Sequence, residues 1–229
     1  MVKLVKNKLV FFVLIYTFFL LSNFITSKLA YSATESILFQ NGVNNYNGTD
    51  DVIITSLFSN ETHGNGITAR EGYLRVSNQY YEARSILKFN DIKIPQKAKI
   101  IDAKLILAIS DWSGGITIEG YYLKTDWDID SKKLGWKYRK DNLTWKEDGG
   151  AGDIIPDKSI LIEDLNGQGD QIKTITIDSE VIRMWINNPS SNNGILFTML
   201  NNGSSAWIHS SKDLNINLRP ALIIKYQID

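Results

Sequence analysis

The segment YEARSILKF, residues 81–89, alternates polar and apolar side chains with a period of two. Successive side chains of a β-strand point to opposite faces, so this pattern predicts a strand with two different faces. The face suited to a hydrophobic core consists of Ser85, Leu87 and Phe89. The opposite face, which the sequence leaves as a solvent face or a binding face, consists of Arg84, Ile86 and Lys88.

The same alternation recurs along most of the chain. The other segments that carry it are 51–55, 72–77, 99–110, 115–125, 159–165, 171–177, 194–200, 205–211 and 218–226. In 99–110, the predicted apolar face consists of Ile101, Ala103, Leu105, Leu107 and Ile109. Because turn residues rather than helical patterns separate these segments, the sequence predicts an all-β protein with an antiparallel sandwich or barrel.

One short helix is predicted at about residues 178–188. Asp178 can cap the first turn, and apolar residues then recur at helical spacing, as in Val181 and Trp185. Pro189 prevents the helix from continuing. The helix is expected to close one end of the sandwich.

Residues 1–32 have the layout of a secretory signal peptide. Three lysines precede an apolar run at 9–21, and small residues gather at 29–36. Cleavage is expected after Ser32, with Ala33 as the neighbouring choice. The alternative is an uncleaved membrane anchor, but the apolar run is short for a spanning helix, which needs about 20 residues.

Removal of the signal peptide leaves a single domain, residues 33–229, with no membrane segment. The full chain has 25 basic and 25 acidic residues; loss of the four lysines at 3, 6, 8 and 28 leaves 21 basic residues and a net charge of −4. Such a domain is a poor candidate for nucleic-acid binding. The chain has no cysteine, which fits a bacterial exported protein whose core is large enough without disulfides.

Several motifs occur in an order that resembles secreted bacterial domains of the DNRLRE type. The matching segments are 39–55, 73–107, 143–149, 175–197 and 218–226, and they span almost all of the mature chain. The resemblance implies a jelly-roll-like β-sandwich, non-catalytic as a rule and found with polysaccharide-active enzymes. Some such domains bind carbohydrate, including uronate polymers such as alginate. This chain differs in having no catalytic partner domain.

Aromatic and cationic side chains are the candidate ligand-binding residues. Aromatic rings stack on the apolar faces of pyranose rings, and arginine binds carboxylates through two parallel hydrogen bonds. The candidates are Tyr73, Arg75, Tyr81, Arg84, Lys88, Trp112, Tyr121, Trp127 and Trp136. If 72–77 and 81–89 form a hairpin, Arg75 and Arg84 are expected to share a sheet face. The alternative for Arg84 is an ion pair within the fold, with an acid such as Asp102.

Several of these assignments remain open from sequence alone. Tyr121 and Tyr122 are adjacent on a predicted strand, so only one of them can face the core. Trp112, Trp127 and Trp136 fit a core role and a binding role equally. Trp145 and Trp185 are assigned to the core because they occupy motif positions of the resemblance.

A structural calcium ion is the one cofactor that the sequence suggests. The oxygen-bearing side chains before the strand at 51–55 are Asn47, Thr49, Asp50 and Asp51, and hard oxygen ligands suit calcium. A second cluster is Asp126, Asp128 and Asp130. Hydrogen bonding within the turns explains both clusters without a metal.

The sequence therefore predicts a secreted, extracellular protein that binds a polysaccharide or cell-surface glycan without cleaving it. The second hypothesis is a structural or adhesive cell-surface protein without a sugar site. The third is a polysaccharide lyase or hydrolase. His63 and His209 are the only histidines in the chain, and no catalytic triad or metal-ligand spacing accompanies them.

Overall fold

The computed structural model describes residues 33–58, 72–113, 115–163, 165 and 169–228. The predicted signal peptide, its cleavage site and His63 lie outside these residues. Residues Thr34–Ile228 group into one compact unit.

Among the described residues, no helix combines the length and the apolar character that crossing a membrane requires.

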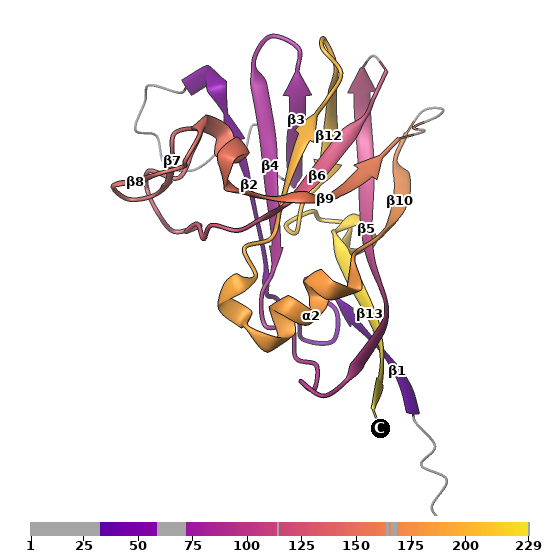
Figure 1. Cartoon of the computed structure of the whole chain (residues 1–229). Helices are drawn as coiled ribbons and strands as arrows, with labels where there is room; N and C mark the ends of the chain where they lie inside the picture. The colour runs from indigo at the N-terminus through magenta and orange to yellow at the C-terminus, as the bar shows by residue number, and fades with distance from the viewer. Residues whose placement is uncertain (1–32, 59–71, 114, 164, 166–168, 229) are drawn as a thin grey trace, which may run out of the picture. The chain divides into compact units, whose positions relative to one another are not determined.

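Antiparallel β-structure dominates the fold (Figure 1). The strands are β1 (Ala33–Phe39), β2 (Thr49–Thr55), β3 (Tyr73–Asn78), β4 (Glu82–Phe89), β5 (Lys99–Ser113), β6 (Ile118–Leu123), β7 (Tyr138–Lys140), β8 (Leu143–Thr144), β9 (Ile154–Ile162), β10 (Gln171–Thr176), β11 (Ile195–Met199), β12 (Ser205–His209) and β13 (Ala221–Ile228). The helices are α2 (Ser179–Asn187) and four 3₁₀ turns at Ser56–Phe58, Asp148–Asp153, Pro189–Ser191 and Ile216–Leu218. The predicted all-β class is confirmed, and a strand overlaps every segment with the alternating pattern.

The main sheet has eleven strands and curls into two facing parts. The first part runs β2-β4-β11-β6-β9, and the second contains β3, β12, β5, β10, β13 and β1. Between them lies the main core, to which Leu87, Phe197, Leu105 and Ile224 contribute buried side chains from both parts. This arrangement is the sandwich that the alternation predicts.

The predicted apolar face of β5 is correct from Ala103 to Ile109 but wrong at Ile101. Asp102 pairs with Lys225, and Ile100 pairs with Tyr226, so Ile101 is the extra residue of a β-bulge. A bulge changes which side chains face the core. Ile100 is therefore buried, whereas Ile101 is 43% exposed.

The helix α2 matches its prediction. The Asp178 side chain accepts a hydrogen bond from the backbone N–H of Glu180, as an N-cap residue does. Figure 1 shows α2 across the lower part of the strands. The buried Trp185 ring meets the ring of Tyr122 edge to face, with centroids 6.0 Å apart. Trp185 thus has the predicted core role.

A second hydrophobic cluster lies on the outer face of the first part of the sheet. Its buried residues are Val52, Ile54, Ile86, Leu123, Trp127, Leu134, Trp145 and Leu196. The segment 124–153, which includes β7 and β8, covers this face and is named the covering segment. Figure 1 shows β7 and β8 beside β2 and β4. The sequence leaves the face of β4 that carries Ile86 as a solvent or binding face. The centre of this face is instead buried in a second core.

Candidate functional site

Arg75 lies between two aromatic rings on the outer face of the second part of the sheet. Its guanidinium carbon is 5.1 Å from the ring centroid of Tyr81 and 5.1 Å from that of Trp207. Arg75 Nη1 donates a hydrogen bond of 2.6 Å to Tyr81 Oη. Trp207 is the direct cross-strand partner of Arg75, because β12 pairs with β3. We name Tyr73, Arg75, Tyr81 and Trp207 the platform.

No carboxylate of the described residues forms an ion pair with Arg75. Its Nε is buried and has no hydrogen-bond partner within the described part of the chain. The aromatic faces stabilise the cation through their ring quadrupoles but do not neutralise it. The platform therefore combines half-buried aromatic rings with a positive charge that forms no ion pair with an acid in the part of the chain that the structure describes.

The end of the platform is held by a histidine with two acidic partners. The Tyr73 ring lies 6.3 Å from that of Trp207 and 4.7 Å from that of His209. The buried His209 contacts Asp213 through Nδ1 at 2.6 Å and Asp170 through Nε2 at 3.0 Å. Both ring nitrogens of His209 are thus occupied by contacts within the fold.

Arg75 and Arg84 do not share a face. In the β3–β4 ladder, Ser77 pairs with Ala83 and Asn78 pairs with Glu82. Beyond Ala83 the two strands separate, because Ser85 of β4 pairs with Ile53 of β2 and Phe197 of β11. Arg75 and Arg84 therefore lie on the outer faces of different parts of the sandwich. The expected common face of Arg75, Arg84 and Lys88 is therefore wrong.

Arg84 connects β4 to the covering segment. Its guanidinium lies 4.8 Å from the ring centroid of Trp136, and Nη1 donates to the carbonyl oxygen of Gly149 at 2.8 Å. Nη2 forms an ion pair with Glu82 at 2.7 Å, so the partner is Glu82 and not Asp102. The Arg84 side chain is 15% exposed. Arg84 and Trp136 thus hold the fold together instead of presenting an open binding face.

The remaining aromatic candidates divide between core and surface. Trp127, a ligand-binding candidate for which the sequence leaves a core role open, is buried, and its Nε1 donates to the carbonyl oxygen of Asn193 at 2.9 Å, so the structure favours the core role. Trp145 is also buried in the second cluster, as predicted. Trp112 is half-buried against the main core. None of these three belongs to the platform.

Tyr121 and Tyr122 point to opposite faces as expected. Tyr122 is buried in the main core, and Tyr121 is half-buried on the outer face. The Tyr121 hydroxyl donates a hydrogen bond to Glu119. Burial, followed by this hydrogen bond, raises the pKa of Tyr121 to about 12. The hydroxyl therefore stays protonated at neutral pH and acts as a donor.

Lys88 lies on the outer face of β4, on the opposite part of the sandwich from Arg75. In the β2–β4 ladder it pairs with Asp50. Asp50 also accepts a hydrogen bond of 2.7 Å from the side-chain amide of Asn90. Lys88 is half-buried at this position. Lys88 therefore lies outside the platform, with Asp50 as its cross-strand neighbour.

The four predicted calcium ligands do not converge. Asp50 and Asp51 are neighbours on β2 and point to opposite faces. Asp51 is buried and accepts a hydrogen bond of 2.5 Å from the backbone N–H of Ser211. The backbone N–H of Thr49 donates to Asn41 Oδ1 at 2.9 Å. Within the described residues, no group of three or more histidine or acidic side chains is placed to hold a metal ion. Calcium binding through Asn47 and these residues stays a prediction.

The carboxylates of the covering segment serve the fold. Asp126 pairs with Arg139 at 2.5 Å and also with Lys140. The hydrogen bond from Lys140 is the main reason that the pKa of Asp126 lies below its usual value. Asp128 accepts a hydrogen bond from the backbone N–H of Asp130, which is an Asx-turn. The turn interpretation therefore accounts for Asp128.

Trp207 is the platform residue that the candidate set from the sequence omits. The segment 205–211 alternates, so Trp207 and His209 share a face, and this much is visible in the sequence. That β12 lies beside β3, with Trp207 opposite Arg75, depends on the pairing of distant strands.

No protein-family model matches this chain, and comparison with curated proteins finds no significant match. The class that the fold defines is therefore an all-β protein with a curled antiparallel sheet and one short helix. The resemblance to DNRLRE-type domains stays a proposal.

Proposed function

We propose that this protein is a secreted, non-catalytic carbohydrate-binding protein of the DNRLRE type, and that its platform binds an acidic polysaccharide. The observation that carries the proposal is the position of Arg75 between the Tyr81 and Trp207 rings, with no carboxylate partner among the described residues. The side chains of the platform come from two adjacent strands and the turn that follows β3.

The chemistry of the platform suits a uronate. The guanidinium presents N–H donors in a planar fork that matches a carboxylate, and stacking on rings fixes its orientation in advance. Tyr73 and Trp207 offer apolar ring surface for the C–H faces of neighbouring sugar units. A chain that alternates apolar faces and carboxylates therefore finds both partners on one surface.

Binding to sodium alginate and polygalacturonate, measured by affinity electrophoresis against neutral xylan, tests this proposal. Arg75→Met keeps most of the apolar stem but removes the charge, so we expect retention on the acidic polymers to fall at least about tenfold, the loss of a charged hydrogen bond. Retention should also weaken as salt rises, because exposed charge interactions are screened. Unchanged retention of Arg75→Met would refute the proposal.

Lys88→Ala is the matched control, because Lys88 is a half-buried cation on the opposite part of the sandwich. We expect it to bind the acidic polymers as the unmodified protein does. A parallel measurement of melting temperature separates binding from stability, since Arg75→Met also removes the hydrogen bond to Tyr81 and the cation–π contacts with both rings. Release of unsaturated or reducing ends from the polymers would instead favour a lyase or hydrolase.

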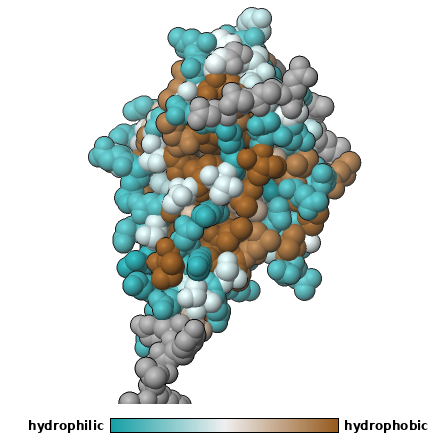
Figure 2. All heavy atoms as spheres, turned by 90° about the vertical axis from the view of Figure 1, so that its right-hand side faces the viewer, coloured by the Kyte–Doolittle hydropathy of each residue, from teal (hydrophilic) through white to brown (hydrophobic). Residues whose placement is uncertain are grey.

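A structural or adhesive surface protein is the second candidate function, and one observation favours it. The outer face of β5, β10 and β13 carries Ile106, Ile172 and Ile223, which are half-buried or exposed. Figure 2 views the side where these strands lie in Figure 1 and shows hydrophobic residues along its middle. Exposed apolar patches are typical of interaction surfaces. Binding to none of the glycans would favour this function.

Calcium and secretion belong to the same proposal. Repeating the electrophoresis with EDTA tests the predicted ion, since loss of retention that added calcium restores would support it. Secretion rests on the sequence of residues 1–32. N-terminal sequencing of the exported protein would test cleavage near residue 32.

A further inference from the structure

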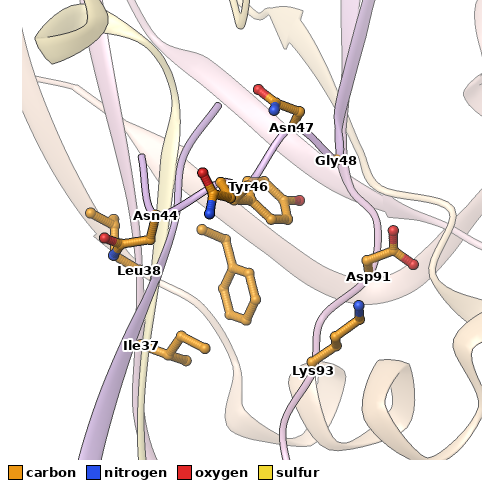
Figure 3. Close-up of a pocket in the computed structure, with 10 residues that line it drawn as sticks. Ile37, Leu38, Asn44, Tyr46, Asn47, Gly48, Asp91 and Lys93 are labelled. Carbon is orange, nitrogen blue, oxygen red and sulfur yellow. The ribbon is translucent and has the colours of Figure 1, made fainter. Parts of the chain in front are cut away.

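A pocket of about 540 Å³ opens between the end of β1, the turn that follows it, and the loop after β4 (Figure 3). It lies apart from the platform, with which it shares no residue. Its volume is in the range of small-molecule sites, roughly 300–1,000 Å³. Figure 3 shows Asp91 and Lys93 on one wall, Ile37 and Leu38 on the opposite wall, and Tyr46 between them.

The aromatic part of the pocket is rigid. The Tyr46 ring meets the Phe39 ring edge to face, with centroids 5.4 Å apart, and Tyr46 Oη donates to the carbonyl oxygen of Asn90 at 2.9 Å. The backbone N–H of Asn90 donates in turn to Gly48 at 2.7 Å. Burial raises the pKa of Tyr46, so its hydroxyl remains a donor at neutral pH. The two loops therefore form one preorganised wall.

The polar part of the pocket is held by unusual backbone conformations. Asn44, Asn45 and Asp91 have φ values of 51°, 60° and 52°, in the left-handed region that non-glycine residues seldom adopt. All three line the pocket. Asparagine and aspartate tolerate this region better than other side chains do. Strained residues of this kind gather at ligand sites more often than elsewhere.

The charges and hydrogen-bonding groups define the ligand. Asn44, Asn45 and Asn47 each offer amide donors and a carbonyl acceptor, which together suit hydroxyl groups that both donate and accept. Asp91 and Lys93 contribute opposite charges, so the pocket has no net charge to favour an anion. The half-buried side chains of Tyr46, Ile37 and Leu38 supply the apolar contact for sugar C–H groups.

We propose that this pocket binds one neutral pyranose unit, as a second glycan site that acts independently of the platform. Asp91 accepts hydrogen bonds from neighbouring hydroxyls, and the asparagines complete their hydrogen bonding. A uronate is disfavoured because its carboxylate would meet that of Asp91.

Titration followed by backbone amide NMR tests the proposal on the whole protein. The probes are the methyl glycosides of glucose, galactose, mannose and N-acetylglucosamine, with methyl glucuronoside and glycylglycine as the charged and zwitterionic comparisons. We expect at least one neutral glycoside to shift the amides of residues 40–48 and 90–93. Shifts at 73–81 and 205–209 report the platform separately, so failure of one site is distinguishable from failure of the other.

Two aspartate variants form a matched pair. Asp91→Asn removes the charge but tolerates the same backbone, and we expect it to weaken glycoside binding about tenfold, since charge-assisted hydrogen bonds are roughly twice as strong as neutral ones. Asp157 has a φ of 61°, is likewise exposed and lies outside the pocket. Asp157→Asn should therefore bind as the unmodified protein does.

Four results would overturn the proposal. The first is the absence of shifts at 40–48 and 90–93 with every neutral glycoside, and the second is equal or tighter binding of methyl glucuronoside at this pocket. The third is binding of glycylglycine in place of the glycosides. The fourth is an equal effect of Asp91→Asn and Asp157→Asn on glycoside binding.

Discussion

Replacing Arg84 with alanine should loosen the covering segment. The substitution removes the hydrogen bond from Nη1 to Gly149, the contact with the Trp136 ring and the ion pair with Glu82. A hydrogen bond from a charged group contributes about 1.5–3 kcal/mol, and a partly desolvated cation–π contact about 1–2 kcal/mol. The pair with the largely exposed Glu82 adds less than about 1 kcal/mol.

One contribution opposes these losses of stability. Arg84 Nε is buried and has no partner among the described residues, so its removal returns part of a desolvation cost of about 1–3 kcal/mol. The expected net loss is about 3 kcal/mol. For a domain of this size each kcal/mol lowers the melting temperature by about 2–4 °C, which gives a decrease of roughly 6–12 °C.

Thermal and urea unfolding followed by circular dichroism measure this loss. Arg183→Ala is the control, because Arg183 is an exposed arginine whose ion pair with Glu180 spans 3.5 Å; we expect it to change stability by less than about 0.5 kcal/mol. Trypsin should also cut residues 124–153 faster in Arg84→Ala than in Arg183→Ala. A loss below about 1 kcal/mol, or equal proteolysis of the two variants, would show that Arg84 does not hold the covering segment.

Three further predictions concern other contacts. Gly149→Ala should destabilise the fold by about 2–4 kcal/mol in urea unfolding, because its φ is 71° and a Cβ would lie 2.6 Å from the Trp136 ring. Gly169→Ala is the control, since Gly169 has a φ of 82° but open space around it, and it should destabilise the fold by only about 1 kcal/mol. Burial raises the pKa of Asp51, so its contribution to stability is lost as pH rises through that folded-state value. The free energy of unfolding of Asp51→Asn should therefore increase relative to that of the unmodified protein between about pH 4 and 7. The hydrogen bond from Lys158 lowers the pKa of Asp178, so the stability it contributes is lost as pH falls below about 4. The stability of Asp178→Asn should therefore decrease relative to that of the unmodified protein as pH rises from about 2 to 4. The same sign for the two variants, each over its own pH range, would contradict the argument. Trp207→Ala should reduce retention on alginate, whereas Trp112→Ala should leave it unchanged. The reverse result would place the glycan elsewhere.

Local pattern was sufficient for most elements of the fold. The alternation in 81–89 and 171–177 matches β4 and β10 closely, and Asp178 and Pro189 bound α2 as expected. These signals are short-range, because side-chain period, capping and turn chemistry act within a few residues. The strands β1, β7 and β8 escaped prediction. β7 and β8 have three and two residues, too few for a period to be recognised.

The candidate site was predictable only in part. Tyr73, Arg75 and Tyr81 were identified from residue type and strand face, and they do lie together. The grouping of Arg75 with Arg84 failed because β3 and β4 are paired at only two positions and then continue into different parts of the sandwich, where β4 pairs with β2 and β11. This separation depends on distant strands, and the sequence near residue 81 does not specify it.

The sequence by itself determined that the chain forms an antiparallel β-fold, where most strands and the helix lie, and which side chains carry the chemistry. Tertiary structure alone decided which of those side chains meet. Trp207 joins Arg75 because β12 lies beside β3, and Ile86 becomes core because residues 124–153 cover it. Both outcomes depend on contacts between residues far apart in the chain, and the period of a single strand holds no information about such contacts.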